Sequence, residues 1–100
     1  MVIKLNKNIS IYEIKRNNYK YNIIDIRSIE KYNDNHMPGA IHIQKDELKN
    51  NYYKYLVKNK MYVIYCREGK NSSILCSFLN NLGYNTYSVI GGYENWILSK

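Results

Sequence analysis

Short runs of apolar, β-branched residues alternate with helical patterns from one end of the 100-residue chain to the other. Five such runs have the length and composition of strands, and they cover residues 2–5, 21–26, 40–43, 61–66 and 86–90. Strands that alternate with helices are typical of α/β folds, in which helices cover a parallel sheet. The sequence therefore predicts a central, mainly parallel five-stranded sheet with helices on both faces.

The helical segments between these runs have plausible start residues. Asn8 or Ser10 can cap a short helix that carries Ile11 and Ile14. Further helices are expected over residues 28–33, 47–55 (with Asp46 as the cap), 71–82 and 93–98. In the helix over 71–82, one face is expected to be buried, and it carries Leu75, Phe78, Leu79 and Leu82.

Length and charge narrow the class of protein. We expect residues 1–100 to form one domain, without a signal peptide. The net charge is +7, but the lysines are scattered, which argues against a nucleic-acid partner. The longest apolar run, residues 61–66, is too short to span a membrane. The two cysteines are too few for a disulfide scaffold, so a reducing, cytoplasmic location is expected.

Cys66 lies at the end of the most apolar run, which is expected to be the central strand. Ligands of open α/β sheets bind at the carboxyl ends of strands, and a helix is expected to begin about five residues after Cys66. Gly69 allows a tight turn, and Asn71 or Ser72 lies where a helix N-cap belongs. We therefore expect free amides and the helix dipole to converge on the thiol and favour its ionised form.

Charged side chains flank this cysteine. Arg67 and Lys70 add positive charge, whereas Glu68 opposes thiolate formation unless it points outward. Together these features predict a nucleophilic cysteine that handles an anionic substrate. The alternative is that Cys66 only packs in the core, because free cysteine is among the most buried residue types.

The other cysteine is expected to pack. Cys76 lies ten residues after Cys66, at the edge of the apolar face of a helix that leads away from the loop. A role as a resolving thiol is the less favoured alternative. The chain has no C-x2-C or H-x3-H pairing, which argues against zinc.

Four motifs, in order, resemble those of the rhodanese family. The D-x-R motif at the end of the second strand is matched by DIR at 25–27. The motif E-x-[FY]-x-x-G-H-I-P-G-A is similar to EKYNDNHMPGA at 30–40. The active loop C-x-x-G-x-[R or polar]-S resembles CREGKNS at 66–72. The tail motifs L-G-[FY] and G-G-x-x-x-W are matched by LGY at 82–84 and GGYENW at 91–96.

This resemblance covers nearly the whole chain and implies a rhodanese-like fold and ping-pong sulfur transfer. Cys66 would take a sulfur from a small anionic donor such as thiosulfate, release sulfite and carry a persulfide. A thiol or cyanide acceptor, with a thioredoxin-like protein among the candidates, would then remove the sulfur. No metal or organic cofactor is implied. The implied substrate-binding residues are Arg67, Glu68, Gly69, Lys70, Asn71 and Ser72, and the implied supporting residues are Asp25 and Arg27.

Several positions depart from the family pattern. Asn71 stands where the loop often has arginine, Asn35 replaces a glycine, and Lys31 replaces a common acid, for which Glu30 could substitute as a partner of Arg27. A rival function from another class is a non-catalytic, protein-binding or regulatory rhodanese-like module, although such modules commonly lack the cysteine. Related phosphatases and arsenate reductases need C-x5-R, and the sixth residue after Cys66 is a serine.

Overall fold

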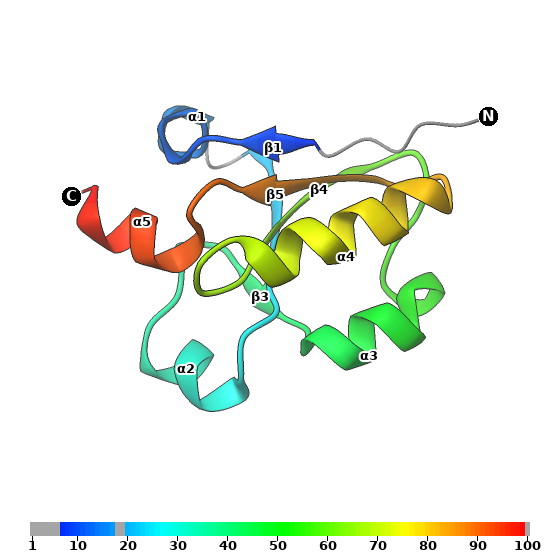
Figure 1. Cartoon of the computed structure of the whole chain (residues 1–100), viewed down its shortest axis with the longest axis horizontal. Coiled ribbons are helices and arrows are strands. Elements are labelled where there is room, and N and C mark those ends of the chain that lie inside the picture. The colour runs from blue at the N-terminus through cyan, green and yellow to red at the C-terminus, as the bar shows by residue number, and fades with distance from the viewer. Residues whose placement is uncertain (1–6, 18–19, 100) are drawn as a thin grey trace.

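The structure is a computed structural model that describes residues 7–17 and 20–99. Its centre is a five-stranded sheet in the order β1-β5-β4-β2-β3, and every strand pair is parallel (Figure 1). The strands are β1 (Asn8–Ile9), β2 (Asn22–Asp25), β3 (Ile41–His42), β4 (Met61–Tyr65) and β5 (Asn85–Val89). The predicted α/β fold is confirmed, and β4 is the middle strand, as expected for its apolar sequence.

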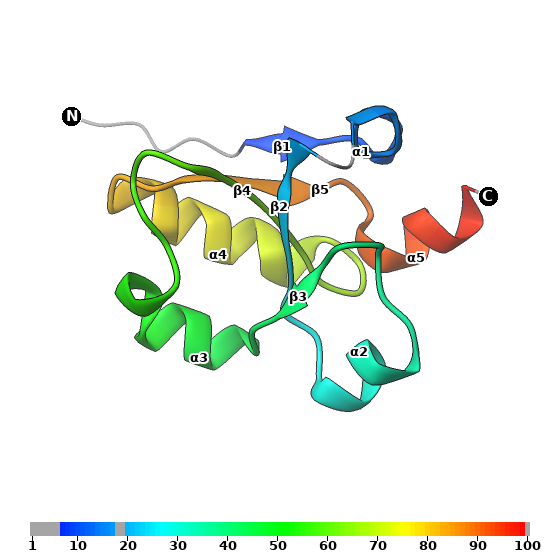
Figure 2. The same ribbon diagram turned by 180° about the vertical axis from the view of Figure 1, so that it is seen from behind.

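Helices pack on both faces of this sheet. They are α1 (Ile11–Asn17), α2 (Ile29–Asp34), α3 (Lys45–Asn50), α4 (Lys70–Asn81) and α5 (Gly92–Leu98), with a 3-10 turn, η2, at Tyr52–Lys54. One buried cluster joins the sheet to α3 and α4, and a second joins it to α1 and α5. Helices α1 and α5 lie at the same end of the molecule (Figures 1 and 2). The amino group of Lys15 on α1 lies 5.0 Å from the ring centre of Trp96 on α5.

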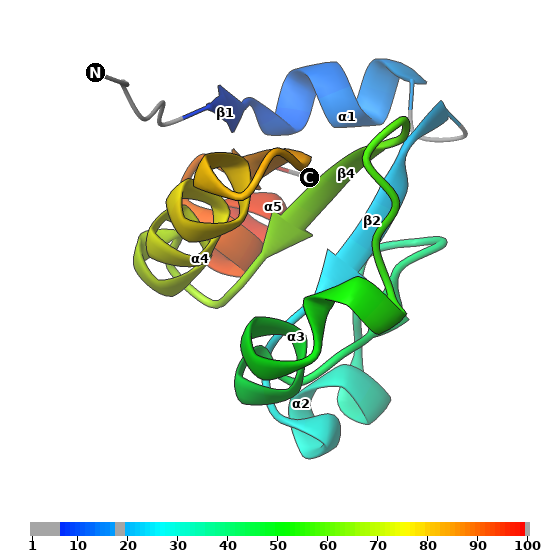
Figure 3. The same ribbon diagram turned by 90° about the vertical axis from the view of Figure 1, so that its right-hand side faces the viewer.

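Alternation along β4 sends its side chains to both clusters. Val63 and Tyr65 pack towards α1 and α5, whereas Tyr62, Ile64 and Cys66 pack towards α3 and α4. Figure 3 shows α4 and α3 next to the strands β4 and β2 from this side. The consecutive residues Tyr65 and Cys66 therefore take part in different layers of the molecule.

Two of the expected elements near the amino terminus are shifted. The strand expected over residues 2–5 lies outside the described residues, and the observed edge strand is β1, which pairs with Ser88 and Val89 of β5. Asn8 belongs to this strand and does not cap a helix. Ser10 does cap α1, because its hydroxyl accepts a hydrogen bond from the amide of Glu13 at 3.1 Å.

The prediction of a helix over 47–55 with Asp46 as its cap is wrong at both ends. Gln44 is the cap, and its side-chain oxygen accepts from the amides of Asp46 and Glu47. At the other end Asn51 leaves helical geometry, with φ −130° and ψ 35°, and its side-chain amide bonds back to Glu47. The segment therefore divides into the short helix α3 and the turn η2.

Helix α4 also differs from expectation at its start and on its buried face. It begins at Lys70 after Gly69, which adopts φ +101°, so Asn71 and Ser72 lie inside the helix and neither is the N-cap. The buried side chains of α4 are Ser72, Leu75, Cys76 and Leu79. Phe78 and Leu82, which were expected to be buried, are each 37% exposed, because the buried face is turned towards Ser72 and Cys76.

Candidate active site

The sulfur atom of Cys66 receives the free amides at the start of α4. Its Sγ accepts hydrogen bonds from the backbone N–H of Gly69 and of Ser72, both at 3.2 Å. The hydroxyl Oγ of Ser72 lies 3.4 Å from the same sulfur. Ser72 is the third residue of α4, where a capping side chain usually receives an amide, so the sulfur takes the place of the cap. The expected convergence of amides on Cys66 is present, with the thiol itself as the acceptor.

The loop of residues 66–72, which we call the Cys66 loop, is held from behind by the first residues of α5. The carbonyl of Cys66 accepts from the amide of Tyr93 at 2.9 Å, and the carbonyl of Arg67 accepts from that of Glu94 at 3.0 Å. A Cβ atom on Gly92 would lie 2.6 Å from both carbonyl oxygens, closer than real Cβ contacts allow. Gly92 therefore permits the approach of backbone to backbone that supports the loop.

The charged residues of the Cys66 loop point away from the sulfur. Arg67 is 72% exposed and its Nε pairs with the carboxylate of Glu94 at 2.9 Å, so part of its positive charge is neutralised there. Glu68 is 61% exposed and points outward. Lys70 is exposed and borders a small hollow of about 210 Å³, which Cys66, Glu68 and Asn71 also border. Arg67 and Lys70 were expected to place positive charge beside the thiol. They therefore do so only at the outer edge of the site.

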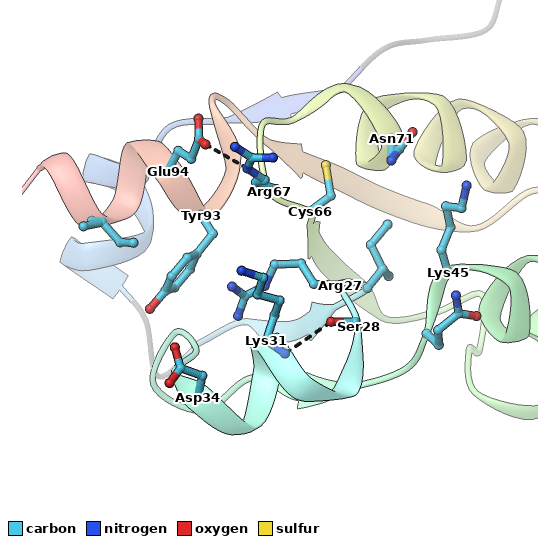
Figure 4. A pocket seen from close by; sticks show the side chains of 13 residues that line it. Arg27, Ser28, Lys31, Asp34, Lys45, Cys66, Arg67, Asn71, Tyr93 and Glu94 are labelled. Carbon is cyan, nitrogen blue, oxygen red and sulfur yellow. Dashed lines mark hydrogen bonds and ion pairs between the residues drawn. The ribbon is translucent and has the colours of Figure 1, made fainter.

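A larger pocket of about 500 Å³ opens on the other side of Cys66 (Figure 4). Residues from five segments border it, and those with polar or aromatic side chains are Arg27, Ser28, Lys31, Asp34, Gln44, Lys45, Arg67, Asn71, Tyr93 and Glu94. Four of these side chains are cationic and two are acidic. In residues 7–17 and 20–99, neither Lys31 nor Lys45 has an ion-pair partner. This wall of the site is therefore suited to an anion.

Arg27 is held rigidly at the floor of this pocket. Its guanidinium makes a forked contact with the carboxylate of Asp25, with Nη2 to Oδ2 at 2.7 Å, and Nη2 also donates to the carbonyl of Asn35 at 2.6 Å. Its Cζ lies 4.1 Å from the ring centre of Tyr93, which covers it. Burial lowers the pKa of Arg27, but the hydrogen bond and charge of Asp25 outweigh burial and raise it overall. The guanidinium therefore stays charged.

Asp25 lies beneath the pocket and does not border it. It is fully buried, and its Oδ2 also accepts from the hydroxyl of Tyr65 at 2.6 Å. That hydroxyl in turn accepts from the amide of Met37 at 3.0 Å. Burial first, and then the hydrogen bond to Asp25, raise the pKa of Tyr65 far above its usual value. The carboxylate is thus a structural anchor for Arg27. No described contact joins Glu30 to Arg27, so the suggested substitute pair is absent from the described residues.

The remaining thiol is enclosed in the core. Cys76 is 1% exposed and packs among apolar side chains of the cluster under α3 and α4. Burial raises the pKa of its thiol to about 11. Among residues 7–17 and 20–99 no three His, Cys, Asp or Glu side chains are grouped so that they could hold a metal ion. In the same part of the chain, no helix has the length and apolar character that crossing a bilayer requires.

Several residues at the site were not predicted from the sequence, among them Ser88, Lys45 and Tyr93. Ser88 on β5 is 2% exposed and lies 2.7 Å, oxygen to oxygen, from Ser72. Lys45 and Tyr93 border the large pocket. The sequence does hold a signal for Ser88, because Thr86 and Ser88 are alternate residues on one side of a predicted strand. In the structure both are buried, which is unusual for hydroxyl residues.

Comparison with known protein families identifies the fold. Residues 10–99 match the rhodanese-like domain. The chain belongs to the rhodanese family. A rhodanese-related protein from Thermoplasma volcanium has the same fold, with a TM-score of 0.85 and 28% identity over 93% of this chain and 92% of that chain. The resemblance inferred from the four sequence motifs is thereby confirmed.

Rhodanese relatives of known name include proteins of similar and of greater length. The thiosulfate sulfurtransferase GlpE of Tolumonas auensis is 31% identical over 75 residues, which are 74% of this chain and 70% of that protein. The "Probable molybdopterin-synthase adenylyltransferase" of Porphyra purpurea is 33% identical over 85 residues. This second match spans 84% of the present chain but 22% of the longer relative. The named relatives of this chain thus include sulfurtransferases of the rhodanese family.

Proposed function

We propose that this rhodanese carries a sulfane sulfur as a persulfide on Cys66 and passes it from a small anionic donor to a thiol acceptor. The observation that carries the proposal is the position of Sγ, which accepts two backbone amides and borders a pocket with four cationic side chains. Amides directed at the sulfur stabilise a thiolate there, and the thiolate is the nucleophilic form. The cations attract a negatively charged donor.

Thiosulfate is the donor that we favour, because GlpE is named for this substrate. The thiolate of Cys66 attacks the outer sulfur of thiosulfate and forms a new S–S bond. The bond between the two sulfurs of thiosulfate breaks, and sulfite leaves with its electron pair. The negative charge that stood on Sγ then lies on the outer sulfur of the persulfide. Lys31, Lys45 and the buried guanidinium of Arg27 face the pocket into which this sulfur and the leaving sulfite project.

The size of the pocket bears on the acceptor. A volume of about 500 Å³ is typical of sites for molecules much larger than thiosulfate. We therefore propose a thiol acceptor that brings its sulfur into the pocket with part of its own structure, such as an exposed thiol of a thioredoxin-like protein. Cyanide can replace it in an assay. The reaction needs no metal or organic cofactor, and the cytoplasm, where thiols stay reduced, is the proposed location.

Asn71 places an uncharged side chain at the border of the pocket, at a position where an arginine is common in the family. It borders both the large pocket and the outer hollow, and its side chain is exposed. Positive charge at the pocket comes instead from Lys31 and Lys45, and Lys45 borders a further hollow together with Asn71. We propose that these two lysines bind the donor's charge, with Asn71 supplying hydrogen bonds only.

Incubation with thiosulfate followed by mass spectrometry of the intact chain tests the proposal. We expect a mass increase of one sulfur atom on Cys66, loss of this adduct on adding cyanide, and formation of thiocyanate. Cys66→Ser should abolish all three, whereas Cys76→Ser is the matched control and should keep them. If the wild-type protein gives no adduct with thiosulfate or any other sulfane donor, and no thiocyanate, the chain acts as the non-catalytic binding module and the proposal is wrong.

A further inference from the structure

The hydroxyl of Ser88 lies directly behind the sulfur site and the proposed reaction does not use it. Ser88 is on β5, next to β4 in the sheet, and its side chain is 2% exposed. Its Oγ lies 2.7 Å from the Oγ of Ser72. Within the described part of the chain this is the one hydrogen-bond partner of the Ser88 hydroxyl.

Burial decides which of the two hydroxyls donates. A serine hydroxyl has one hydrogen, and leaving it without a partner in a buried site costs about 1–3 kcal/mol. Ser72 has alternative acceptors, because its Oγ also lies 3.3 Å from the carbonyl of Gly69 and 3.4 Å from the sulfur of Cys66. Ser88 has no such choice among the described residues. The arrangement that satisfies both groups is the one in which Ser88 donates to Ser72.

We infer that Ser88 is a positioning residue for Cys66: by donating to Ser72 it directs the hydrogen of Ser72 away from β5 and towards the reacting sulfur. This inference rests on the proposed role of Cys66 as the nucleophile. Ser88 touches neither donor nor acceptor and acts through Ser72.

The hydrogen bonds can be followed through the reaction. In the thiol form, Ser72 accepts from Ser88 and from the S–H of Cys66, and it donates to the carbonyl of Gly69. When Cys66 loses its proton, the hydrogen of Ser72 turns to the thiolate, which then receives two amides and one hydroxyl. When the persulfide forms, the charge moves to the outer sulfur and the hydrogen of Ser72 can return to Gly69. No proton leaves Ser72 or Ser88 in any step.

Another buried hydroxyl on the same strand provides a control. Thr86 is fully buried, and its Oγ1 lies 2.9 Å from the side-chain oxygen of Asn80 and 3.4 Å from the carbonyl of Cys76. It has no described contact with Cys66. Thr86→Val therefore removes a buried hydroxyl from β5 without touching the sulfur site.

The test compares the alkylation of Cys66 by iodoacetamide in the wild type, Ser88→Ala and Thr86→Val as a function of pH, with the modified residue identified by peptide mass spectrometry. This measurement depends on the thiolate and not on any sulfur donor, so it separates failure of this inference from failure of the proposed function. We expect Ser88→Ala to slow alkylation roughly two- to fivefold near pH 7, since a polarised hydroxyl stabilises the thiolate more than an isolated one. The rate should return to the wild-type value at high pH, where the thiolate is complete in both proteins.

Steady-state sulfur transfer from thiosulfate to cyanide gives a second readout, in which Ser88→Ala should lower kcat and leave KM unchanged. Thr86→Val should match the wild-type pH profile even where it lowers the thermal unfolding midpoint. A Ser88→Ala profile that coincides with that of the wild type, or a rate loss that is the same at every pH, would overturn the inference.

Discussion

The two cysteines of this protein lie in the same buried cluster, ten positions apart in sequence, and their surroundings differ in two respects that govern thiol chemistry. Cys66 precedes α4, where the first amides of the helix have no carbonyl partner within it. Cys76 lies inside α4, where the amides already donate to the preceding turn. The sulfur at the helix start therefore receives two N–H groups, and the one in the middle packs in an apolar cluster with the side chain of Thr86 as a polar neighbour.

The comparison predicts different reactivity for two thiols that are both buried. Cys66 is 6% exposed and Cys76 is 1% exposed, so accessibility separates them only slightly. The difference lies in free backbone dipoles and in a pocket of about 500 Å³ on one side of Cys66. A family resemblance points to Cys66 as the nucleophile, and the geometry of α4 gives an independent physical reason.

The largest expected effect is the difference in alkylation rate between the two thiols. At pH 8, peptide mapping of the native protein over time should show iodoacetamide modifying Cys66 about 100-fold or more faster than Cys76, because a pKa near 11 leaves very little thiolate at Cys76. In denaturant the two rates should become equal. Similar rates in the native protein would contradict the distinction drawn between the two sites.

The second effect concerns the support of the Cys66 loop. Gly92→Ala should lower the free energy of unfolding by about 3 kcal/mol and slow sulfur transfer at least tenfold, because the new Cβ pushes against the carbonyls of Cys66 and Arg67. Urea unfolding and thiocyanate formation measure the two quantities.

Gly39→Ala is the matched control for this variant. Gly39 also has a positive φ, +82°, but a Cβ there meets nothing within 4 Å. Gly39→Ala should lower the free energy of unfolding only by the backbone strain, about 1–2 kcal/mol, and leave sulfur transfer unchanged. Equal loss of activity in the two variants would mean that contact with the loop carbonyls does not support the site.

The smallest effect is on stability at Cys76. Cys76→Ala should lower the free energy of unfolding by about 1 kcal/mol near pH 7, since it removes one buried sulfur atom, and sulfur transfer should persist. The pKa of Cys76 is raised from 9.0 to about 11 in the folded state. Its stabilising contribution is therefore complete below pH 9 and is lost as the pH rises through 11, because the unfolded chain ionises first.

This pH dependence sharpens the same measurement. Urea unfolding of the wild type and Cys76→Ala between pH 8 and 10.5 should show the wild type losing up to about 2 kcal/mol relative to the variant, so that the difference in free energy passes through zero and changes sign. Tyr65 and the lysines titrate in both proteins and cancel in the comparison. A difference that stays constant over this range would mean that Cys76 is not held in its protonated form by burial.

Most of the fold could be predicted from local sequence patterns. The apolar run ending at Cys66 indicated the central strand, and the following helix indicated where the amides would point. These patterns involve residues that are close together in the sequence, so they can be recognised without knowledge of the tertiary structure. The caps predicted at Asp46 and at Asn71 or Ser72 were wrong because the capping acceptors are Gln44 and a sulfur atom, neither of which is a usual cap.

Residues brought to the site from distant segments were harder to predict. Ser88 reaches Ser72 because β5 lies beside β4, and strand order is not readable from strand patterns. The partner of Arg67 is Glu94, 27 residues away, so part of the positive charge that was expected beside the thiol is neutralised by this carboxylate. Lys45 borders the pocket only because the loop after β3 returns across it.

The support that the Gly92 turn gives to the Cys66 loop also has a consequence for synthesis. The chain grows from its amino end, so β4 and α4 leave the ribosome before Tyr93 and Glu94, whose amides bind the carbonyls of Cys66 and Arg67. A nascent chain that stops short of these residues holds the cysteine and its helix but lacks the backbone contacts that shape the loop. The geometry of the loop is therefore completed only after all five strands of the sheet that carries it have been made.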